Sequence, residues 1–125
     1  MRFSIVMFLL IAASCSRYNY SSDVKKNSKA YQAYLDTIVC YEEGKNSVFV
    51  INYREAILFL SFVTNINSKA GYSETIGYLN KSDYESDMEV YKAWYKKYRS
   101  RLTDPYIDSI YRRLGLVPPA RLNIR

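Results

Sequence analysis

The chain of 125 residues contains no histidine. Histidine is the commonest general base at neutral pH and the commonest metal ligand, so two usual sources of enzyme chemistry are missing. The sequence also lacks a glycine-rich phosphate loop and any group of residues at metal-ligand spacing. We therefore predict that the protein is not an enzyme and that it holds no cofactor and no metal.

Long apolar runs are also absent. The apolar segment from Phe3 to Ala13 has 11 residues, whereas a helix that crosses a bilayer needs roughly 20. A single basic residue, Arg2, precedes the segment, and its last residues before Cys15 are small. A short charged start, a short apolar core and small residues at a processing site are typical of a secretory signal peptide.

The residues in front of Cys15, Ile11-Ala12-Ala13-Ser14, resemble the lipobox of bacterial lipoproteins. The resemblance implies that residues 1–14 are a signal peptide and that lipid on Cys15 anchors the protein in a membrane. In Gram-negative lipoproteins, Ser16 in place of Asp implies the outer membrane, and we expect its periplasmic face because no acidic cluster follows Cys15. The lipobox usually has Leu, Val or Ile where this chain has Ala12, so an unlipidated secreted protein is the alternative.

Cysteine is scarce as well, since Cys40 is the only one besides Cys15. With Cys15 lipidated, Cys40 has no partner, and no internal disulfide forms even in an exported compartment. Cys40 lies off the apolar stripe of its predicted helix and is either exposed or, as is commoner, a buried inert thiol. Stability must then come from packing, to which the 14 tyrosines contribute half-buried rings.

Positive charge is concentrated at the end of the chain. Residues 15–87 carry 8 basic and 9 acidic side chains, whereas residues 88–125 carry 9 basic and 3 acidic ones. Without its first 14 residues the chain has 111, enough for one modest domain. We predict a flexible tether at residues 15–22, a single helical domain at 23–117 and a loose C-terminal tail at 118–125.

The first predicted helix covers residues 23–43, in which apolar side chains recur every three or four residues. Gly44 is placed to end this helix. Its opposite face carries Lys25, Lys29 and Asp36.

The second predicted helix begins with a capping box formed by Asn52 and Glu55. Its apolar residues, up to Ile66, cover almost every side, which is typical of a central helix. The preceding segment, residues 47–51, is either extended or an early part of this helix.

The third predicted helix opens with a capping box of Ser82 and Glu85 and continues to about Leu102. Its core-facing stripe consists of Tyr84, Met88, Tyr91, Trp94, Tyr95, Tyr98 and Leu102. A fourth helix is predicted to have Asp104 as its cap, Pro105 at its first position and Gly115 just past its end.

These elements predict an all-α fold, a small bundle of about four helices arranged as two helical hairpins, with one irregular Gly-Tyr loop at residues 67–82. The stretch from Tyr53 to Leu102 has a Gly-Tyr loop and a Trp-Tyr-Lys-Lys-Tyr helix. It is similar to small helical lipoproteins of unknown function in Gram-negative bacteria. That resemblance implies no catalytic residue.

The third helix supplies the first candidate site. Lys92, Lys96 and Arg99 line one edge of its aromatic stripe, and Lys97 and Arg101 line the other. Such residues either cover the edge of a core with their stems or bind acidic head groups or an envelope protein close to the lipid anchor. Basic residues with aromatics also suggest nucleic acid, but an exported chain rarely meets it, so no nucleic acid partner is expected. The oligomeric state is left open.

The alternative function is binding of a glycan or peptidoglycan. In this hypothesis Tyr72 and Tyr78 of the Gly-Tyr loop and Trp94 of the third helix are stacking platforms, which requires their rings to be exposed. The carboxylates Glu42-Glu43, Asp83, Glu85, Asp87 and Glu89 are interpreted as solvated surface; an acid–base pair of the glycosidase type is the rival interpretation.

Overall fold

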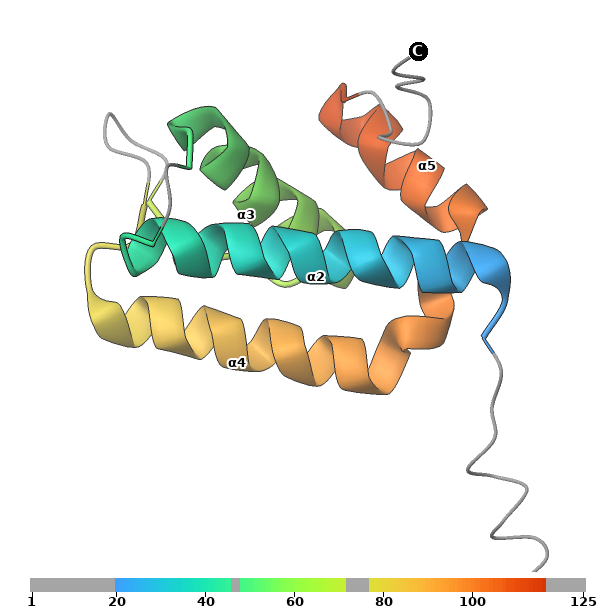
Figure 1. The fold of residues 1–125 in the computed structure, drawn as a ribbon, viewed down its shortest axis with the longest axis horizontal. Helices are drawn as coiled ribbons and strands as arrows, with labels where there is room; N and C mark the ends of the chain where they lie inside the picture. The colour runs from blue at the N-terminus through green and yellow to red at the C-terminus, as the bar shows by residue number, and fades with distance from the viewer. Residues whose placement is uncertain (1–19, 46–47, 72–76, 117–125) are drawn as a thin grey trace, which may run out of the picture.

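The computed structural model describes residues 20–45, 48–71 and 77–116. In this part the chain forms four α-helices and one short 3-10 helix: α2 (Ser22–Glu42), α3 (Val50–Thr64), α4 (Lys81–Tyr98), η1 (Arg99–Arg101) and α5 (Asp104–Leu114). Between the described residues the only β-pairing is an isolated antiparallel bridge that joins Gly71 to Gly77. The predicted all-α bundle of about four helices is confirmed (Figure 1).

The helices are arranged around α3. α2 and α4 lie side by side and run in opposite directions, with α3 behind α2 in the view of Figure 1. α3 contacts α2, α4 and α5, which confirms the prediction that it is the central helix. α2 and α3 form a hairpin, but the second pair differs from the predicted hairpin. The chain turns at η1, and α5 packs on α3 and α2 instead of lying along α4.

The predicted glycine ends of two helices are confirmed. After α2, Gly44 has a φ of 66° and donates its N–H to the carbonyl of Tyr41, while Lys45 donates to the carbonyl of Cys40 at 2.9 Å. After α5, Gly115 has a φ of 69° and the same pair of hydrogen bonds follows it. Glycine adopts this left-handed conformation at little cost because it has no Cβ.

The predicted helix starts need correction at three places. The cap of α3 is Phe49, whose carbonyl accepts from the N–H groups of Asn52 and Tyr53, so Asn52 is the third residue of the helix. The cap of α4 is Asn80, whose side chain accepts from the N–H of Asp83 at 2.9 Å; Ser82 is the second helical residue. α5 has Thr103 as its cap, so Asp104 and Pro105 each lie one position further in. The third predicted helix also ends at Tyr98, where the chain tightens into η1.

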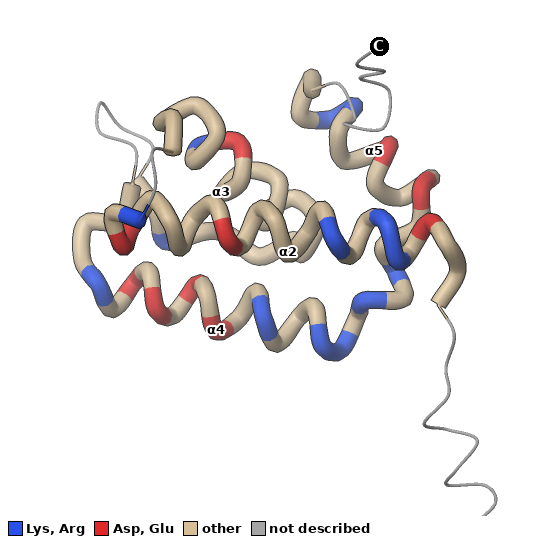
Figure 2. The backbone as a smooth tube through the Cα atoms, in the orientation of Figure 1, with Lys and Arg blue, Asp and Glu red and all other residues tan. Residues whose placement is uncertain are grey.

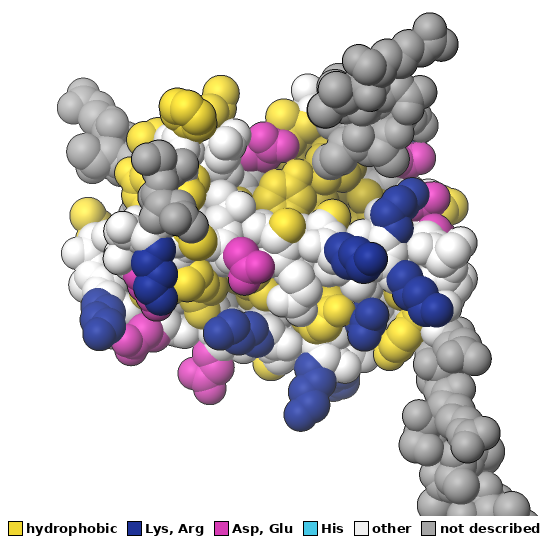
Figure 3. Space-filling model, viewed as in Figure 1, with side chains coloured by type: hydrophobic (Ala, Val, Ile, Leu, Met, Phe, Trp, Pro, Cys, Tyr) yellow, Lys and Arg dark blue, Asp and Glu magenta, His cyan; other side chains and the backbone are white. Residues whose placement is uncertain are grey.

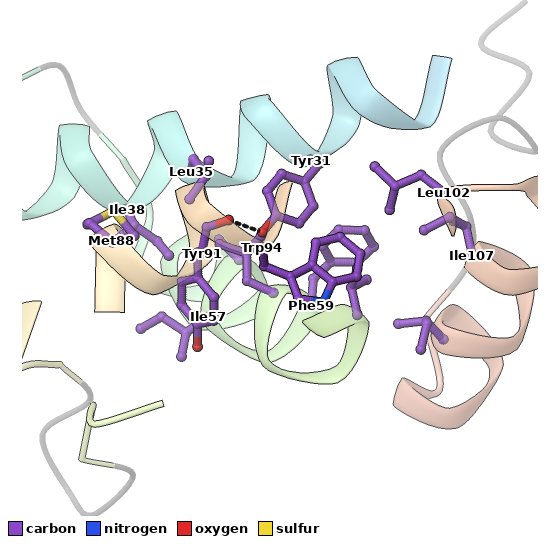
Figure 4. Packing of buried hydrophobic residues seen from close by; sticks show 14 of the residues in the cluster. Tyr31, Leu35, Ile38, Ile57, Phe59, Met88, Tyr91, Trp94, Leu102 and Ile107 are labelled. Carbon is purple, nitrogen blue, oxygen red and sulfur yellow. Dashed lines mark hydrogen bonds between the residues drawn. The ribbon is translucent and has the colours of Figure 1, made fainter. Parts of the chain in front are cut away.

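The core is built largely from aromatic rings. Tyr31 of α2 stacks on Trp94 of α4, with 5.7 Å between ring centroids, and donates its hydroxyl proton to the carbonyl of Tyr91 at 2.6 Å (Figure 4). Beneath them lies Phe59 of α3, which is fully buried. A buried aromatic side chain contributes roughly 1.5 to 3 kcal/mol, so these rings bind α2 and α4 to the central helix.

Cys40 is half-buried, between the exposed and the buried outcomes that the sequence left open. Among the described helices, none has the length and the apolar character needed to cross a membrane.

Candidate functional site

The structure separates the residues that the sequence proposed as a site. Cys15 and Tyr72 lie outside the described residues, as does the C-terminal tail from residue 117. The remaining candidates come from the Gly-Tyr loop, α4 and η1, and they fall into two classes. Tyr78 and Trp94 are packed into the protein, whereas Lys92, Lys96 and Arg99 face the surface to different extents.

Trp94 is not the exposed stacking platform that the glycan hypothesis requires. Only 8% of its surface is exposed, because its ring is packed against Tyr31 and Tyr98. The correction follows from the period of α4, which places Trp94 in the middle of the stripe that faces α2 and α3. The ring of Trp94 is therefore part of the hydrophobic core.

Tyr78 belongs to a polar anchor for the loop. Its hydroxyl donates to Oδ2 of Asp87 at 2.8 Å, and the same oxygen accepts from the hydroxyl of Ser68 at 2.8 Å and from the N–H of Lys69 at 2.9 Å. Burial raises the pKa of Tyr78 above its ordinary value, and the Asp87 carboxylate raises it further. Tyr78 is thus half-buried, its hydroxyl is bound to Asp87, and its ring lies edge-on to the ring of Tyr84.

Asp87 corrects the interpretation of the α4 carboxylates as solvated surface. It is 2% exposed, whereas Glu85 and Glu89 on the same helix are exposed. Asp87 follows Tyr84 by three residues and precedes Tyr91 by four, so the helical period places it on the core-facing stripe. A buried carboxylate needs hydrogen-bond donors, and the loop supplies all three that reach its Oδ2.

The basic residues gather at one end of the molecule, where α2 begins and α4 ends (Figure 2). We call this set the basic end: Lys25, Lys26 and Lys29 of α2, Lys96 and Lys97 of α4, and Arg99 and Arg101 of η1. In the space-filling view their side of the molecule carries a concentration of dark blue side chains (Figure 3). Lys25, Lys26 and Lys29 come from the first predicted helix, so the basic surface is larger than the one predicted from α4 alone.

Two carboxylates also lie at the basic end, and both are used internally. Asp104 pairs with Lys26 at 2.9 Å and accepts from the amide of Asn27 at 3.0 Å. Asp23 accepts from the backbone N–H of Asp104 at 3.0 Å and from the hydroxyl of Ser21. Hydrogen bonds from Ser21 and from the Asp104 backbone lower the pKa of Asp23, and those from Lys26 and Asn27 lower the pKa of Asp104. These contacts fasten the start of α5 to the start of α2.

A groove between α2 and α4 opens within the basic end. Its cavity has a volume of about 530 Å³, and we call it the α2–α4 groove. It is lined by Lys25, Ser28, Lys29, Gln32, Ala33, Asp36, Tyr95 and Arg99. Of the three basic residues predicted on this edge of α4, Arg99 alone lines the groove, while Lys92 and Lys96 are exposed outside it.

Arg99 is held in a fixed position beside this groove. Its Nε–H donates to the hydroxyl oxygen of Ser28 at 3.0 Å. Its guanidinium carbon lies 4.6 Å from the ring centroid of Tyr20 and 5.4 Å from that of Tyr95. A guanidinium over an aromatic face gains about 0.5 to 1 kcal/mol at an exposed site. Tyr20, predicted to be part of the tether, therefore contacts the helical domain.

A second, larger cavity of about 890 Å³ lies at the opposite end of the pair of helices. We call it the acidic-end cavity; its lining includes Glu42, Glu43, Tyr78, Leu79, Asn80, Tyr84, Glu85 and Lys92. Burial raises the pKa of Tyr84, and the nearby carboxylates of Glu43, Glu42 and Glu85 raise it further. This end combines aromatic side chains with three carboxylates and two lysines, Lys81 and Lys92. Glu43 pairs with Lys45 at 2.7 Å and Glu85 with Lys81 at 3.6 Å. Among the described residues, no three carboxylates or thiols are placed so that they could hold a metal ion together.

Neither the protein-family models nor the curated proteins nor the solved structures contain a match to this chain. The ligand chemistry of the two cavities is therefore indicated by the residues that line them. The α2–α4 groove offers one fixed guanidinium and two exposed lysines that suit an anion, and the acidic-end cavity offers rings and carboxylates that suit a polar ligand with hydroxyl groups.

Proposed function

We propose that this protein is a lipid-anchored, non-enzymatic helical module of the bacterial envelope, whose basic end lies against anionic head groups of the membrane that holds Cys15. The anchor comes from the lipobox-like sequence and implies the periplasmic face of the outer membrane. The structure adds an orientation to this proposal. Tyr20, two residues before the start of α2, contacts Arg99 of the basic end.

The contact between Tyr20 and Arg99 is the observation that carries the proposal. Cys15 precedes Tyr20 by five residues, and five residues span at most about 18 Å. A lipid on Cys15 would therefore keep the start of α2 close to the bilayer. Electrostatic attraction is effective over a Debye length of about 8 Å at physiological salt, which makes the basic end the part of the domain best placed to bind acidic head groups.

The magnitude expected from this surface is substantial. A basic residue close to an anionic membrane contributes about 1 kcal/mol. Lys25, Lys29, Lys96, Lys97, Arg99 and Arg101 form no ion pair with any acid among the described residues, so their charge is available.

Mass spectrometry of the protein from its native membrane tests the anchor. We expect cleavage before Cys15 and a mass increase on Cys15 that matches the attached lipid. An unmodified Cys15, in a cleaved or an uncleaved chain, would contradict the anchor. Sensitivity of processing to globomycin is the matched check in cells.

Flotation with vesicles tests the role of the basic end separately from the lipid. The variant Lys96→Glu/Lys97→Glu/Arg101→Glu changes charges outside the α2–α4 groove, in the mature chain with Cys15→Ser. At about 1 kcal/mol per basic residue, the three changes together remove about 3 kcal/mol, so binding to phosphatidylglycerol vesicles should weaken by about a hundredfold or more.

The control variant for the flotation test is Lys45→Glu/Arg54→Glu/Lys81→Glu, which makes the same charge change on exposed residues outside the basic end. It should bind phosphatidylglycerol vesicles as the parent chain does. Equal losses in the two variants would show that only net charge matters and would contradict the oriented model.

Glycan binding is the second candidate function, and the acidic-end cavity is the observation that favours it. Its lining pairs the rings of Tyr78 and Tyr84 with the carboxylates of Glu42, Glu43 and Glu85, and sugars present apolar faces and hydroxyl donors that match such a lining. Calorimetric titration with peptidoglycan fragments should show heat that Tyr84→Ala abolishes. Absence of heat with the parent chain would remove this candidate.

A further inference from the structure

We propose that the α2–α4 groove binds a phosphate group carried on a small polar molecule of sugar-phosphate size. Lys25, Lys29 and Arg99 would hold the phosphate, and Gln32 and Asp36 would accept from hydroxyl or amine groups of the carrier. The inference rests on the proposed function only in placing this ligand in the envelope, because the groove itself is defined by the described residues of α2, α4 and η1.

Arg99 supplies the geometry that distinguishes this groove from a general basic surface. Its Nε–H is used by Ser28, and its guanidinium lies over the rings of Tyr20 and Tyr95. These contacts fix the plane of the guanidinium before a ligand arrives, so little side-chain entropy is lost on binding. The Nη groups are the donors that a phosphate can accept from, and paired donors on a planar fork suit phosphate oxygens.

Lys25 and Lys29 supply the remaining positive charge. They are four residues apart on α2, so both side chains project on the same side of the helix and line the groove. Both lysines are exposed, and within the described residues neither forms an ion pair. Two mobile ammonium groups beside one fixed guanidinium can pair with a phosphate in its singly or its doubly charged form.

The groove has a direction, from positive to negative charge along α2. Lys25, Lys29, Gln32 and Asp36 all line it, and their spacing of four, three and four residues forms one row. At 1.5 Å per residue, Lys29 and Asp36 are about 10 Å apart along the helix axis. A bare phosphate would leave Gln32 and Asp36 without a role, whereas an amino-sugar phosphate spans this distance.

The volume of the groove agrees with a ligand larger than phosphate. Its cavity of about 530 Å³ lies within the ~300 to 1,000 Å³ that small-molecule sites occupy. Tyr95, which lines the groove, is half-buried and stacks on Tyr31 with 5.1 Å between ring centroids. Because Tyr95 is stacked on Tyr31 and also lies under the Arg99 guanidinium, it forms a fixed wall of the groove.

Titration followed by NMR tests the site. The mature chain with Cys15→Ser is titrated with glucosamine 6-phosphate, glucosamine and inorganic phosphate, and the signals followed are the Arg99 Nε–H and the backbone amides of α2 and η1. Glucosamine 6-phosphate should bind at least about tenfold more tightly than either of the other two, because it alone reaches both ends of the groove.

Three substitutions sharpen the test. Arg99→Lys keeps the charge but loses the planar guanidinium and its hydrogen bond to Ser28. Lys29→Gln removes an exposed charge without affecting packing. Each substitution should weaken the binding of glucosamine 6-phosphate by about tenfold. Asp36→Asn should weaken glucosamine 6-phosphate and leave inorganic phosphate unchanged or slightly tighter. The matched control, Lys92→Gln/Lys97→Gln, removes two α4 charges outside the groove and should change neither affinity by more than about twofold.

The source of the phosphate is distinguished by competition. If vesicles with phosphorylated head groups displace glucosamine 6-phosphate, a lipid head group occupies the groove; if they do not, the natural ligand is a soluble phosphate.

Failure of this inference is separable from failure of the proposed function, because Lys96→Glu/Lys97→Glu/Arg101→Glu tests the membrane surface alone. The proposal is overturned by unchanged affinity in Lys29→Gln, by equal loss in the Lys92→Gln/Lys97→Gln control, or by no ligand-induced shift at Arg99.

Discussion

Replacement of Asp87 tests the polar anchor of the Gly-Tyr loop. The carboxylate is 2% exposed, and its Oδ2 accepts from Ser68, Lys69 and Tyr78 at 2.8 to 2.9 Å. A hydrogen bond to a charged group contributes about 1.5 to 3 kcal/mol net. The three donors are only partly buried and can bind water in the variant, so we take the lower figure for each. Asp87→Ala should then cost about 4.5 kcal/mol, a large fraction of the ~5 to 15 kcal/mol that stabilises a typical domain.

Urea denaturation of the mature chain, followed by Trp94 fluorescence and by circular dichroism, measures this cost. Asp87→Asn keeps one acceptor oxygen and loses the charge, so its loss of stability should be about half that of Asp87→Ala. Glu89→Ala is the matched control, because it removes the same charge from an exposed position of the same helix. It should change the free energy of unfolding by less than about 0.5 kcal/mol.

The reasoning is refuted if Asp87→Ala and Glu89→Ala have the same free energy of unfolding. Hydrogen exchange gives an independent readout of the loop. The amide of Lys69, which donates to Asp87, should exchange faster in Asp87→Asn than in the parent chain while core amides of α3 stay protected.

Three further predictions concern the rest of the fold. Asn27→Ala should destabilise the protein by about 1 to 3 kcal/mol, because the buried Asn27 amide donates to the carbonyl of Leu102 at 2.8 Å. A melting temperature that is unchanged within experimental error would contradict the role given to this hydrogen bond. The pKa values of Asp23 and Asp104 are lowered in the fold, so their contribution is present above the unfolded pKa of about 3.9 and is lost as the pH falls below it. Urea midpoints should accordingly fall below about pH 4 in the parent chain and fall less in an Asp104→Asn variant. Trp94 should emit at short wavelength and resist quenching by acrylamide, since it is 8% exposed; strong quenching would place its ring at the surface.

Much of the fold is predictable because helix-forming patterns are local. The apolar period of α2 and the glycine after it, Gly44, identified that helix within one residue at each end. The start of α3 differs from the prediction because its cap, Phe49, makes no side-chain capping bond and so leaves no capping signal in the sequence. The start of α4 differs because several polar residues near a helix start can each act as a cap. In α4 the side chain of Asn80 takes that role ahead of Ser82, whose own hydroxyl donates to Asn80.

The site was less accessible to sequence reasoning, because it depends on which helices lie together. Lys92, Lys96 and Arg99 share an edge of one helical projection, but only Arg99 meets Lys25 and Lys29 across the antiparallel pair of α2 and α4. Nothing local to either helix specifies that pairing. Asp87 is recognisable as buried from the sequence, because its spacing from Tyr84 and Tyr91 places it on the core-facing stripe of α4. The exposed acids next to it, Glu85 and Glu89, favour the opposite interpretation.

The proposed orientation is tested most directly by measuring which end of the lipidated protein is close to the bilayer. Single cysteines at the exposed positions Ser100 and Ser82, in a Cys40→Ser background, place a fluorophore at the basic end or at the start of α4. Ser82 lies 16 residues before the end of α4 at Tyr98, which is about 24 Å along the helix, and Ser100 follows that end by two residues. With head-group quenchers in the vesicles, we predict strong quenching at position 100 and little at position 82. Equal quenching at both positions, or stronger quenching at position 82, would contradict the account.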